Sequence, residues 1–117
     1  MITDSGLNRL LNVLSEELSH IGLGTGTAPI QTSILLTSEQ LRKQVTDSLI
    51  DGTTLVSEIY LDENEGNGLN FSEVGIFCDG ACNTIDTGKL FAGGAMDKTK
   101  DNTQSLTVSF EITVMEV

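Results

Sequence analysis

The sequence predicts a mainly β protein of the α+β kind, with an N-terminal amphipathic helix followed by an antiparallel, sandwich-like β-domain. Three patterns predict this fold class. Leucines recur at helical spacing near the N-terminus, an Asp-Gly pair separates two strand-like segments, and apolar and polar residues alternate without a break near the C-terminus. A chain of 117 residues is expected to form a single domain, with the helix at 1–20 and the β-domain at 21–117.

The helix is expected to run from Thr3 to Leu18. Its apolar stripe follows the i, i+3, i+4, i+7 spacing of one helical face and consists of Leu7, Leu10, Leu11, Leu14 and Leu18. Thr3, Asp4 or Ser5 can cap the first turn, and the glycines from Gly22 onward prevent the helix from continuing. A leucine stripe of this kind either packs in the core or forms the seam of an oligomer, and both alternatives stay open.

The run Gly24-Thr25-Gly26-Thr27 invites comparison with phosphate-binding glycine loops. No lysine follows at the spacing of such loops, and no helix start is placed to receive a phosphate. We expect these glycines to let the chain turn sharply after a short extended piece at Ser19–Leu23.

A short helical turn is expected from Ser38 to Gln44, with Ser38 as its cap. Glu39 and Arg42 are spaced i, i+3, which suits an ion pair on one helical face. If exposed, this pair contributes at most about 1 kcal/mol. If Arg42 instead reaches another backbone segment or a second subunit, it fixes a structural junction.

Strands are expected from here to the C-terminus. Val45–Leu49 and Thr54–Leu61 flank Ile50-Asp51-Gly52-Thr53, and Asp-Gly is a strong hairpin signal. In the second of these strands the residues that point one way are Leu55, Ile59 and Leu61, interrupted by Ser57, with Glu58 and Tyr60 on the other side. Shorter strands are expected at Glu73–Phe77 and Lys89–Ala92.

The last strand shows the clearest alternation in the chain. Its inward positions are Leu106, Val108, Phe110, Ile112 and Val114, and its outward positions are Thr107, Ser109, Glu111, Thr113 and Met115. Such a pattern predicts a long strand with one wet face, with Phe110 as a central core residue.

Several separated pieces of the sequence resemble a family of small tailed-phage virion proteins, found with tail, baseplate and tail-fibre components. The pieces are Ile21-Gly22-Leu23-Gly24-Thr25-Gly26-Thr27-Ala28-Pro29, then Leu36-x-x-Glu39-x-x-Arg42-x-x-Val45, and Asn67-Gly68 before Glu73-Val74-Gly75-Ile76-Phe77. The resemblance extends over roughly the whole chain. It implies a structural role, and it implies a junction rather than catalysis for the acidic-x-x-Arg pattern.

The charge of the chain excludes some partners. Seventeen acidic residues face six basic ones, for a formal net charge of −11, and only Arg42 and Lys43 are adjacent. Phosphate backbones repel such a surface, so we expect no nucleic-acid partner. The charge favours solubility and can steer docking onto a basic partner.

No apolar run approaches the ~20 residues that span a bilayer. With Asp4 in the place of a basic n-region and Asn12 within Leu10–Leu14, we expect no signal peptide, no membrane association and folding in a cytoplasm.

Cys78 and Cys82 form the only cysteine pair, at C-x-x-x-C spacing around Asp79-Gly80. A structural zinc site takes four Cys or His ligands, and His20 is the single histidine, so no metal is expected. Free thiols in a loop and a small local disulfide formed after lysis both stay open.

The loop Asp62-Glu63-Asn64-Glu65-Gly66-Asn67-Gly68 holds three carboxylates, but it matches an EF-hand only in part. A solvated turn is expected, and adventitious calcium binding stays open.

His20 has no Ser or Cys partner in a recognisable motif and is expected at a strand edge. No aromatic sugar platform accompanies the acidic residues. We therefore expect no catalytic residues, no cofactor and no enzyme.

The function expected from the sequence is that of a non-enzymatic structural protein of a tailed-virus particle, in the tail, baseplate or fibre-attachment region. One alternative is a capsid decoration protein, and one from another class is a carbohydrate-binding module on the tail. The expected partners are other virion proteins and further copies of the chain, as a trimer or a ring. The expected location is the virion, assembled in the cytoplasm of the host.

Overall fold

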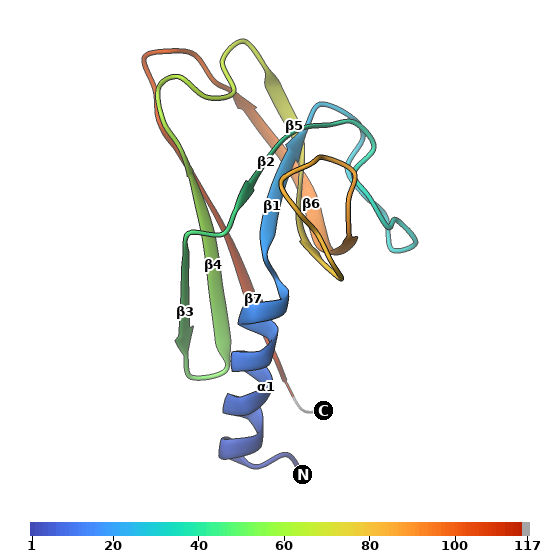
Figure 1. Ribbon diagram of the computed structural model, residues 1–117, viewed down its shortest axis with the longest axis vertical. Coiled ribbons are helices and arrows are strands. Elements are labelled where there is room, and N and C mark those ends of the chain that lie inside the picture. The colour runs from blue at the N-terminus through green and yellow to red at the C-terminus, as the bar shows by residue number, and fades with distance from the viewer. Residues whose placement is uncertain (116–117) are drawn as a thin grey trace.

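The computed structural model describes residues 1–115 and contains one helix followed by seven strands in two antiparallel sheets (Figure 1). In chain order the elements are α1 (Asp4–Glu17), β1 (His20–Gly24), β2 (Glu39–Gln44), β3 (Asp47–Asp51), β4 (Thr54–Leu61), β5 (Asn70–Cys78), β6 (Lys89–Thr99) and β7 (Leu106–Thr113). Sheet A has the order β2-β1-β5-β6, and sheet B has the order β3-β4-β7. The two sheets pack as a sandwich-like domain, which confirms the predicted fold class. The last two residues of the predicted domain, 116 and 117, lie outside the described residues.

The helix forms where the leucine spacing predicts it. The Thr3 hydroxyl accepts a hydrogen bond from the Gly6 N–H at 3.1 Å and so caps the first turn. Leu11 and Leu18 are completely buried among residues of both sheets, and Leu14 packs against the same core. The stripe is therefore part of the chain's own core, which decides between the two alternatives for it. Leu7 and Leu10 are the exceptions, since Leu7 is only partly buried and Leu10 is 45% exposed.

Sheet B contains the predicted hairpin. Asp51 pairs with Thr54 across the turn, and Gly52 has φ +61°, a left-handed conformation that glycine adopts without strain. The inward face of β4 alternates as expected and consists of Leu55, Ser57, Ile59 and Leu61. β7 pairs with β4 along its whole length, from Thr54↔Thr113 to Leu61↔Leu106.

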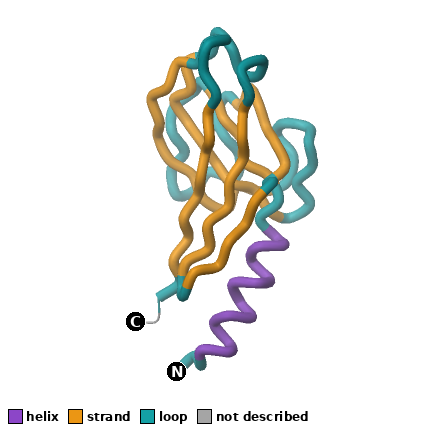
Figure 2. Tube along the Cα trace, turned by 90° about the vertical axis from the view of Figure 1, so that its left-hand side faces the viewer, coloured by secondary structure: helices purple, strands orange, loops and turns teal. Residues whose placement is uncertain are grey.

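The prediction that Phe110 is a central core residue overstates how deeply its side chain is buried. Val108 is buried, whereas Phe110 and Ile112 are only partly buried at the margin of the core. The arrangement of the layers explains this: the hairpin end of sheet B extends past sheet A, where only α1 lies beside it (Figure 2). The alternation of β7 identifies the inward side chains correctly, but the covering layer decides how deeply each one is buried.

In sheet A the segment predicted as a helical turn at Ser38–Gln44 is instead strand β2. It pairs antiparallel with β1, from His20↔Gln44 to Leu23↔Leu41. A helix of so few residues is marginal without tertiary support, whereas the open edge of β1 offers a ladder of hydrogen bonds. The expectation that His20 lies at a strand edge is also wrong. His20 begins β1, which lies between β2 and β5, and is only 6% exposed.

Strand β6 is longer than the predicted Lys89–Ala92, because β5 pairs with it as far as Asn70↔Thr99. Within this sheet, Gly22, Gly75 and Gly93 are paired in register and form one row across β1, β5 and β6. Directly paired residues share a face of the sheet, and this row lies on the face opposite the core residues Ile21 and Ile76. The outer face of sheet A therefore has a floor without side chains.

Candidate functional site: a buried-charge junction on sheet A

Three charged side chains, Glu39, Arg42 and Glu73, are buried on the outer face of sheet A, and we call them the junction. Their exposed fractions are 4%, 7% and 0%. Glu39 and Arg42 come from β2, and Glu73 comes from β5. Burial of a charge is costly unless the group is paired and hydrogen-bonded, so the partners of each group indicate what the junction does.

Glu73 accepts hydrogen bonds from three backbone N–H groups. Its Oε2 accepts from Gly26 at 2.9 Å and from Ser38 at 2.8 Å, and its Oε1 accepts from Thr37 at 2.8 Å. These donors lie at the two ends of the loop that joins β1 to β2, residues 25–38. One carboxylate thus fastens both ends of this loop to β5, an inner strand of the sheet. Charge-assisted bonds of this kind are the stronger class of hydrogen bond.

Arg42 and Glu39 form a bidentate pair. Arg42 Nε donates to Glu39 Oε2 at 2.8 Å, and Nη2 donates to Oε1 at 2.9 Å. The predicted ion pair is confirmed, but both side chains are buried and come from strand β2 rather than from a helix. The guanidinium also stacks over the Phe77 ring, with its central carbon 4.1 Å from the ring centroid.

The pair holds a second loop, residues 79–88 between β5 and β6. Arg42 Nη1 donates to the Thr87 carbonyl and hydroxyl oxygens, each at 2.8 Å, and to the Cys82 carbonyl oxygen at 3.2 Å. Glu39 Oε1 also accepts from the Asp86 N–H at 2.9 Å, and Asp86 has φ +63°, which is uncommon for a residue with a side chain. The junction therefore fixes both long loops on the outer face.

Of the glycines predicted to let the chain turn sharply, Gly26 lies at the bend, whereas Gly24, like Gly22, lies within β1. A Cβ at Gly22 would overlap Glu39 Oε2, and one at Gly24 would lie 2.6 Å from Glu73 Oε2. Gly22 and Gly24 belong to β1 itself, and neither has a positive φ. The chain bends only after them, at Thr25 and Gly26. At Gly22 the Glu39 carboxylate lies directly on the backbone. At Gly24 the Ser38 carbonyl oxygen, 2.5 Å from the position of a Cβ, and the Glu73 carboxylate together leave no room for a side chain.

His20 lies beside the junction and links the loop at residues 79–88 to β1. Its Nδ1 lies 2.7 Å from the Ser19 hydroxyl oxygen, and its Nε2 lies 2.9 Å from Asn83 Oδ1. Both ring nitrogens thus have partners inside the protein. His20 and Asn83 could not be connected from the sequence, because they are far apart in the chain and belong to no shared motif.

The acidic loop at residues 62–68 is organised by hydrogen bonds within the loop and by two lysines outside it. Glu65 accepts from the Asp62 N–H at 3.0 Å and from Lys43 Nζ at 2.9 Å, and these two bonds hold the pKa of the Glu65 carboxyl below its ordinary value. Lys100, completely buried, donates to Asn67 Oδ1 at 2.8 Å. Among residues 1–115 no three His, Cys, Asp or Glu side chains are grouped as metal ligands would be.

The two cysteines are free thiols in different surroundings. Cys78 ends β5, and burial raises the pKa of its thiol, with nearby Glu17 and Asp79 adding to the effect. Cys82 is exposed, and a hydrogen bond with Thr87 lowers the pKa of its thiol. The thiolate is the nucleophile, so the two cysteines should differ in reactivity.

We expect iodoacetamide to alkylate Cys82 several times faster than Cys78 at neutral pH. The rate at Cys82 should rise with pH through a midpoint below that of an ordinary cysteine, because its pKa is lowered, and the midpoint for Cys78 should lie above it. Peptide mass spectrometry over a time course measures both rates. The Cys82→Ser variant should lose the fast phase and keep the slow one. Equal rates in the wild type would contradict these assignments.

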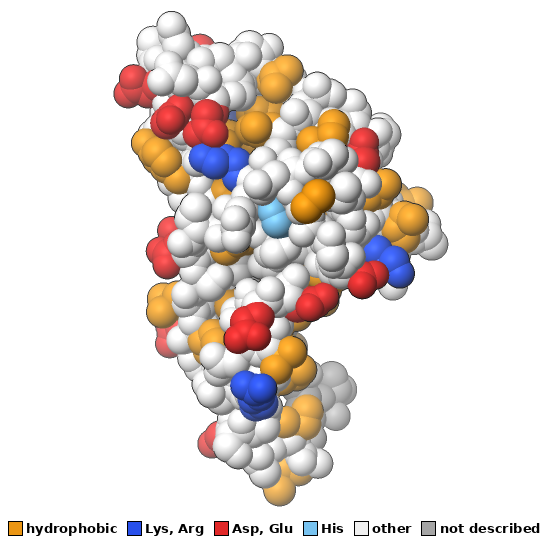
Figure 3. Space-filling view, viewed as in Figure 1, with side chains coloured by type: hydrophobic (Ala, Val, Ile, Leu, Met, Phe, Trp, Pro, Cys, Tyr) orange, Lys and Arg blue, Asp and Glu red, His pale blue; other side chains and the backbone are white. Residues whose placement is uncertain are grey.

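Figure 3 shows acidic side chains distributed along the visible face. Within the part of the chain that the structure describes, no helix is both long and apolar enough to cross a membrane. Neither a scan against protein-family models nor a search of the curated proteins gave a match to this chain.

Proposed function

We propose that this chain is a non-enzymatic structural protein of a tailed-virus particle, in the tail, baseplate or fibre-attachment region. One observation carries the proposal: separated sequence pieces that resemble tail and baseplate proteins meet at the junction. Glycines of the first piece form the floor under Glu39 and Glu73, which belong to the second and third pieces. The similarity thus falls on residues that depend on one another in space.

The bonds of the junction support a structural role. A general acid or base must reach a substrate, and a nucleophile must be open to attack. Glu39, Arg42 and Glu73 are instead buried and bonded to one another or to the backbone of two loops. Such groups are suited to fixing the shape of a subunit rather than to a reaction.

Two alternatives remain for comparison. A capsid decoration protein would be equally small, acidic and built from β-strands. A carbohydrate-binding module is less well supported, because sugars generally stack on neighbouring exposed aromatic rings. The exposed aromatic side chains Tyr60 and Phe91 lie on different sheets, in β4 and β6.

The proposed partners are other virion proteins and further copies of the chain, arranged as a trimer or a ring, with the protein located in the virion after assembly in the host cytoplasm. The leucine stripe no longer supports self-association, since Leu11 and Leu18 are buried within the chain. Support comes instead from large apolar side chains that remain exposed on the loops, among them Ile30 and Ile34. The net charge of −11 argues against nucleic acid as a partner.

Cryo-electron microscopy of whole particles of the virus that encodes this chain tests the proposal. We expect density that fits the sandwich and its protruding α1 at the tail, the baseplate or the point of fibre attachment. Density on the capsid shell would support the decoration alternative instead. Purified particles in which neither density nor peptides of this chain are found would contradict the proposal altogether.

A further inference from the structure

Lys100 is a buried lysine that takes no part in the junction. The residue is 0% exposed, which is rare for a lysine unless its amine is paired with a charge. Of the ion pairs between residues 1–115, none includes Lys100. Within the described part of the chain, the amine is therefore held inside the protein without a counter-charge.

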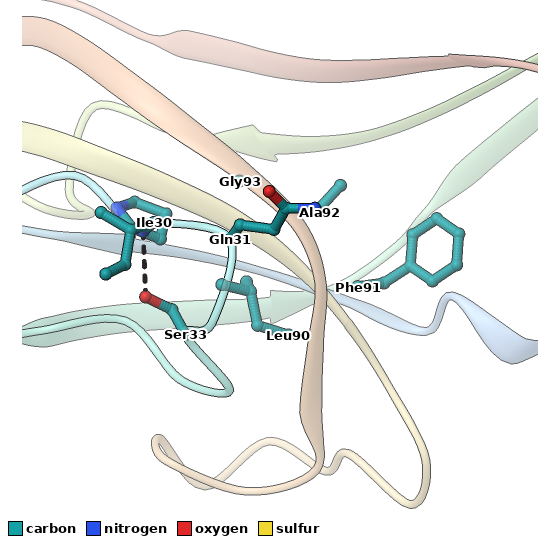
Figure 4. A pocket seen from close by; sticks show the side chains of 8 residues that line it. Ile30, Gln31, Ser33, Leu90, Phe91, Ala92 and Gly93 are labelled. Carbon is teal, nitrogen blue, oxygen red and sulfur yellow. Dashed lines mark hydrogen bonds between the residues drawn. The ribbon is translucent and has the colours of Figure 1, made fainter.

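The hollow of about 290 Å³ beside the start of β6 offers no comparable group (Figure 4). The described residues that line it are all uncharged, and the Ser33 hydroxyl already accepts a hydrogen bond from the Ile30 N–H at 3.0 Å. Lys100 is thus the stronger candidate for chemistry.

The Lys100 amine lies against the side-chain amide of Asn67. Its Nζ is 2.8 Å from Asn67 Oδ1, and its other contact, with the Asp101 carbonyl oxygen, is longer, at 3.4 Å. Because a carbonyl bond is about 1.23 Å long, Nζ lies no more than about 4 Å from Asn67 Cγ. Reacting atoms in a near-attack arrangement are about 3–3.5 Å apart, so a small rotation of the lysine side chain brings Nζ to Cγ.

The surroundings hold both groups in place. Asn67 Nδ2 donates to the Glu63 carbonyl oxygen at 2.8 Å, which keeps Oδ1 turned toward the amine. The Gly68 N–H donates to the Lys100 carbonyl oxygen at 2.9 Å, and the Lys100 N–H donates to the Leu69 carbonyl oxygen at 3.2 Å. Two groups held in contact react as if in one molecule rather than by collision, which removes much of the entropic barrier.

We propose that Lys100 and Asn67 become joined by an isopeptide bond. Nζ, as the neutral amine, attacks Asn67 Cγ and forms an amide, while the bond from Cγ to Nδ2 breaks. Nδ2 takes up the proton that Nζ loses and leaves as ammonia, so the step needs no oxidant and no second substrate. Desolvated lysine amines are known nucleophiles in proteins.

Two features favour the product. A buried charge without a counter-charge is costly, and the bond replaces it with a neutral amide. Asn67 is itself exposed, so the ammonia can leave into solvent.

The bond joins the two connections between the sheets at one end of the molecule. Residues 62–69 lead from β4 in sheet B to β5 in sheet A, and residues 100–105 lead from β6 in sheet A back to β7 in sheet B. Figure 1 shows both connections at the end away from α1. A covalent link there fastens the two sheets to each other. This inference goes beyond the proposed function and does not rest on it.

Intact mass spectrometry of the purified wild type tests the bond. We expect a mass about 17 Da below that of the sequence, equal to one ammonia, at purification or after incubation of the folded protein. Trypsin should then release residues 44–89 joined to residues 99–117, because it does not cleave after a lysine whose amine is part of an amide. Protein kept unfolded in urea should not react, since the contact is then absent.

Three variants identify the reacting groups. Lys100→Arg and Asn67→Ala should each keep the full mass of their sequences. Asn64→Ala is the matched control, because Asn64 is another exposed asparagine of the same loop, and this variant should lose one ammonia as the wild type does.

A competing reaction gives the same change in mass. If the Gly68 nitrogen attacks Asn67 Cγ, a succinimide forms and ammonia is also lost, although the hydrogen bond to Lys100 occupies the Gly68 N–H. A loss of mass that persists in Lys100→Arg, or that yields no joined peptides, would identify the succinimide and overturn the inference. A folded wild type that keeps its full mass throughout the incubation would overturn it as well. The location of the protein in the particle is a separate question, which the cryo-electron microscopy answers.

Discussion

Glu73→Ala is expected to lower the free energy of unfolding by about 3–5 kcal/mol, because buried donors left without an acceptor cost about 1–3 kcal/mol each. Three donors lose their acceptor together in this variant: the N–H groups of Gly26, Thr37 and Ser38. The three hydrogen bonds are only partly buried, so we do not expect the full sum. The change is large beside the roughly 5–15 kcal/mol that stabilises a small domain. Urea denaturation followed by circular dichroism measures it.

Two further variants identify the cause. Glu73→Gln keeps an oxygen for two of the donors but turns an NH₂ group toward the third, so its loss should be intermediate. Glu111→Ala removes an exposed glutamate on β7 and should change stability by less than about 0.5 kcal/mol. A Glu73→Ala midpoint equal to that of Glu111→Ala would mean that the carboxylate does not hold the loop.

Arg42→Ala should also be strongly destabilising, by about 3–5 kcal/mol, because it leaves the buried Glu39 carboxylate without its cation. It further releases the Thr87 and Cys82 carbonyl oxygens in the loop at 79–88. Arg42→Lys should recover little of this, since an ammonium group cannot make the bidentate pair and bond to the loop as well. Thermal or urea unfolding of the three proteins measures the losses.

Arg9→Ala is the matched control for Arg42. Arg9 is exposed on α1, and removal of an exposed charge should cost less than about 1 kcal/mol. If Arg9→Ala and Arg42→Ala shift the unfolding midpoint equally, and both variants are incorporated equally into particles, the junction does not have the role assigned to it.

The sequence predicted the elements whose signal is local. The leucine spacing located α1, Asp51-Gly52 located the hairpin, and the alternation in β7 identified its inward side chains. In these cases the cap, the turn or the period lies within a few neighbouring residues. The Glu39–Arg42 pair was also predicted, although for a helical reason that the structure does not bear out.

The parts that were missed depend on neighbours far apart in the chain. β2 has a helix-compatible sequence and becomes a strand because β1 lies beside it. Gly24 was interpreted as a turn glycine and Gly22 as part of the extended piece before the turn. The need for glycine at both positions arises from Glu39, Glu73 and the Ser38 backbone, which approach from elsewhere in the fold. The same holds for Phe110, whose burial depends on how far sheet A extends over sheet B. One sequence signal could have indicated the junction. It is a pair of glycines at alternate positions within one strand, followed later by isolated glutamates in other strands.

Hydrogen exchange at the amides of Gly26, Thr37 and Ser38 tests most directly whether buried charge fixes the loop on sheet A. These residues lie in a loop, and without the Glu73 carboxylate their amides should exchange as rapidly as other exposed loop amides. We predict instead that they exchange about as slowly as the paired amides of β1 and β5, and that Glu73→Ala makes them fast while the amides of sheet B stay slow. Exchange in the wild type as fast as at Gln31 and Thr32, at the exposed tip of the same loop, would contradict a fixed loop.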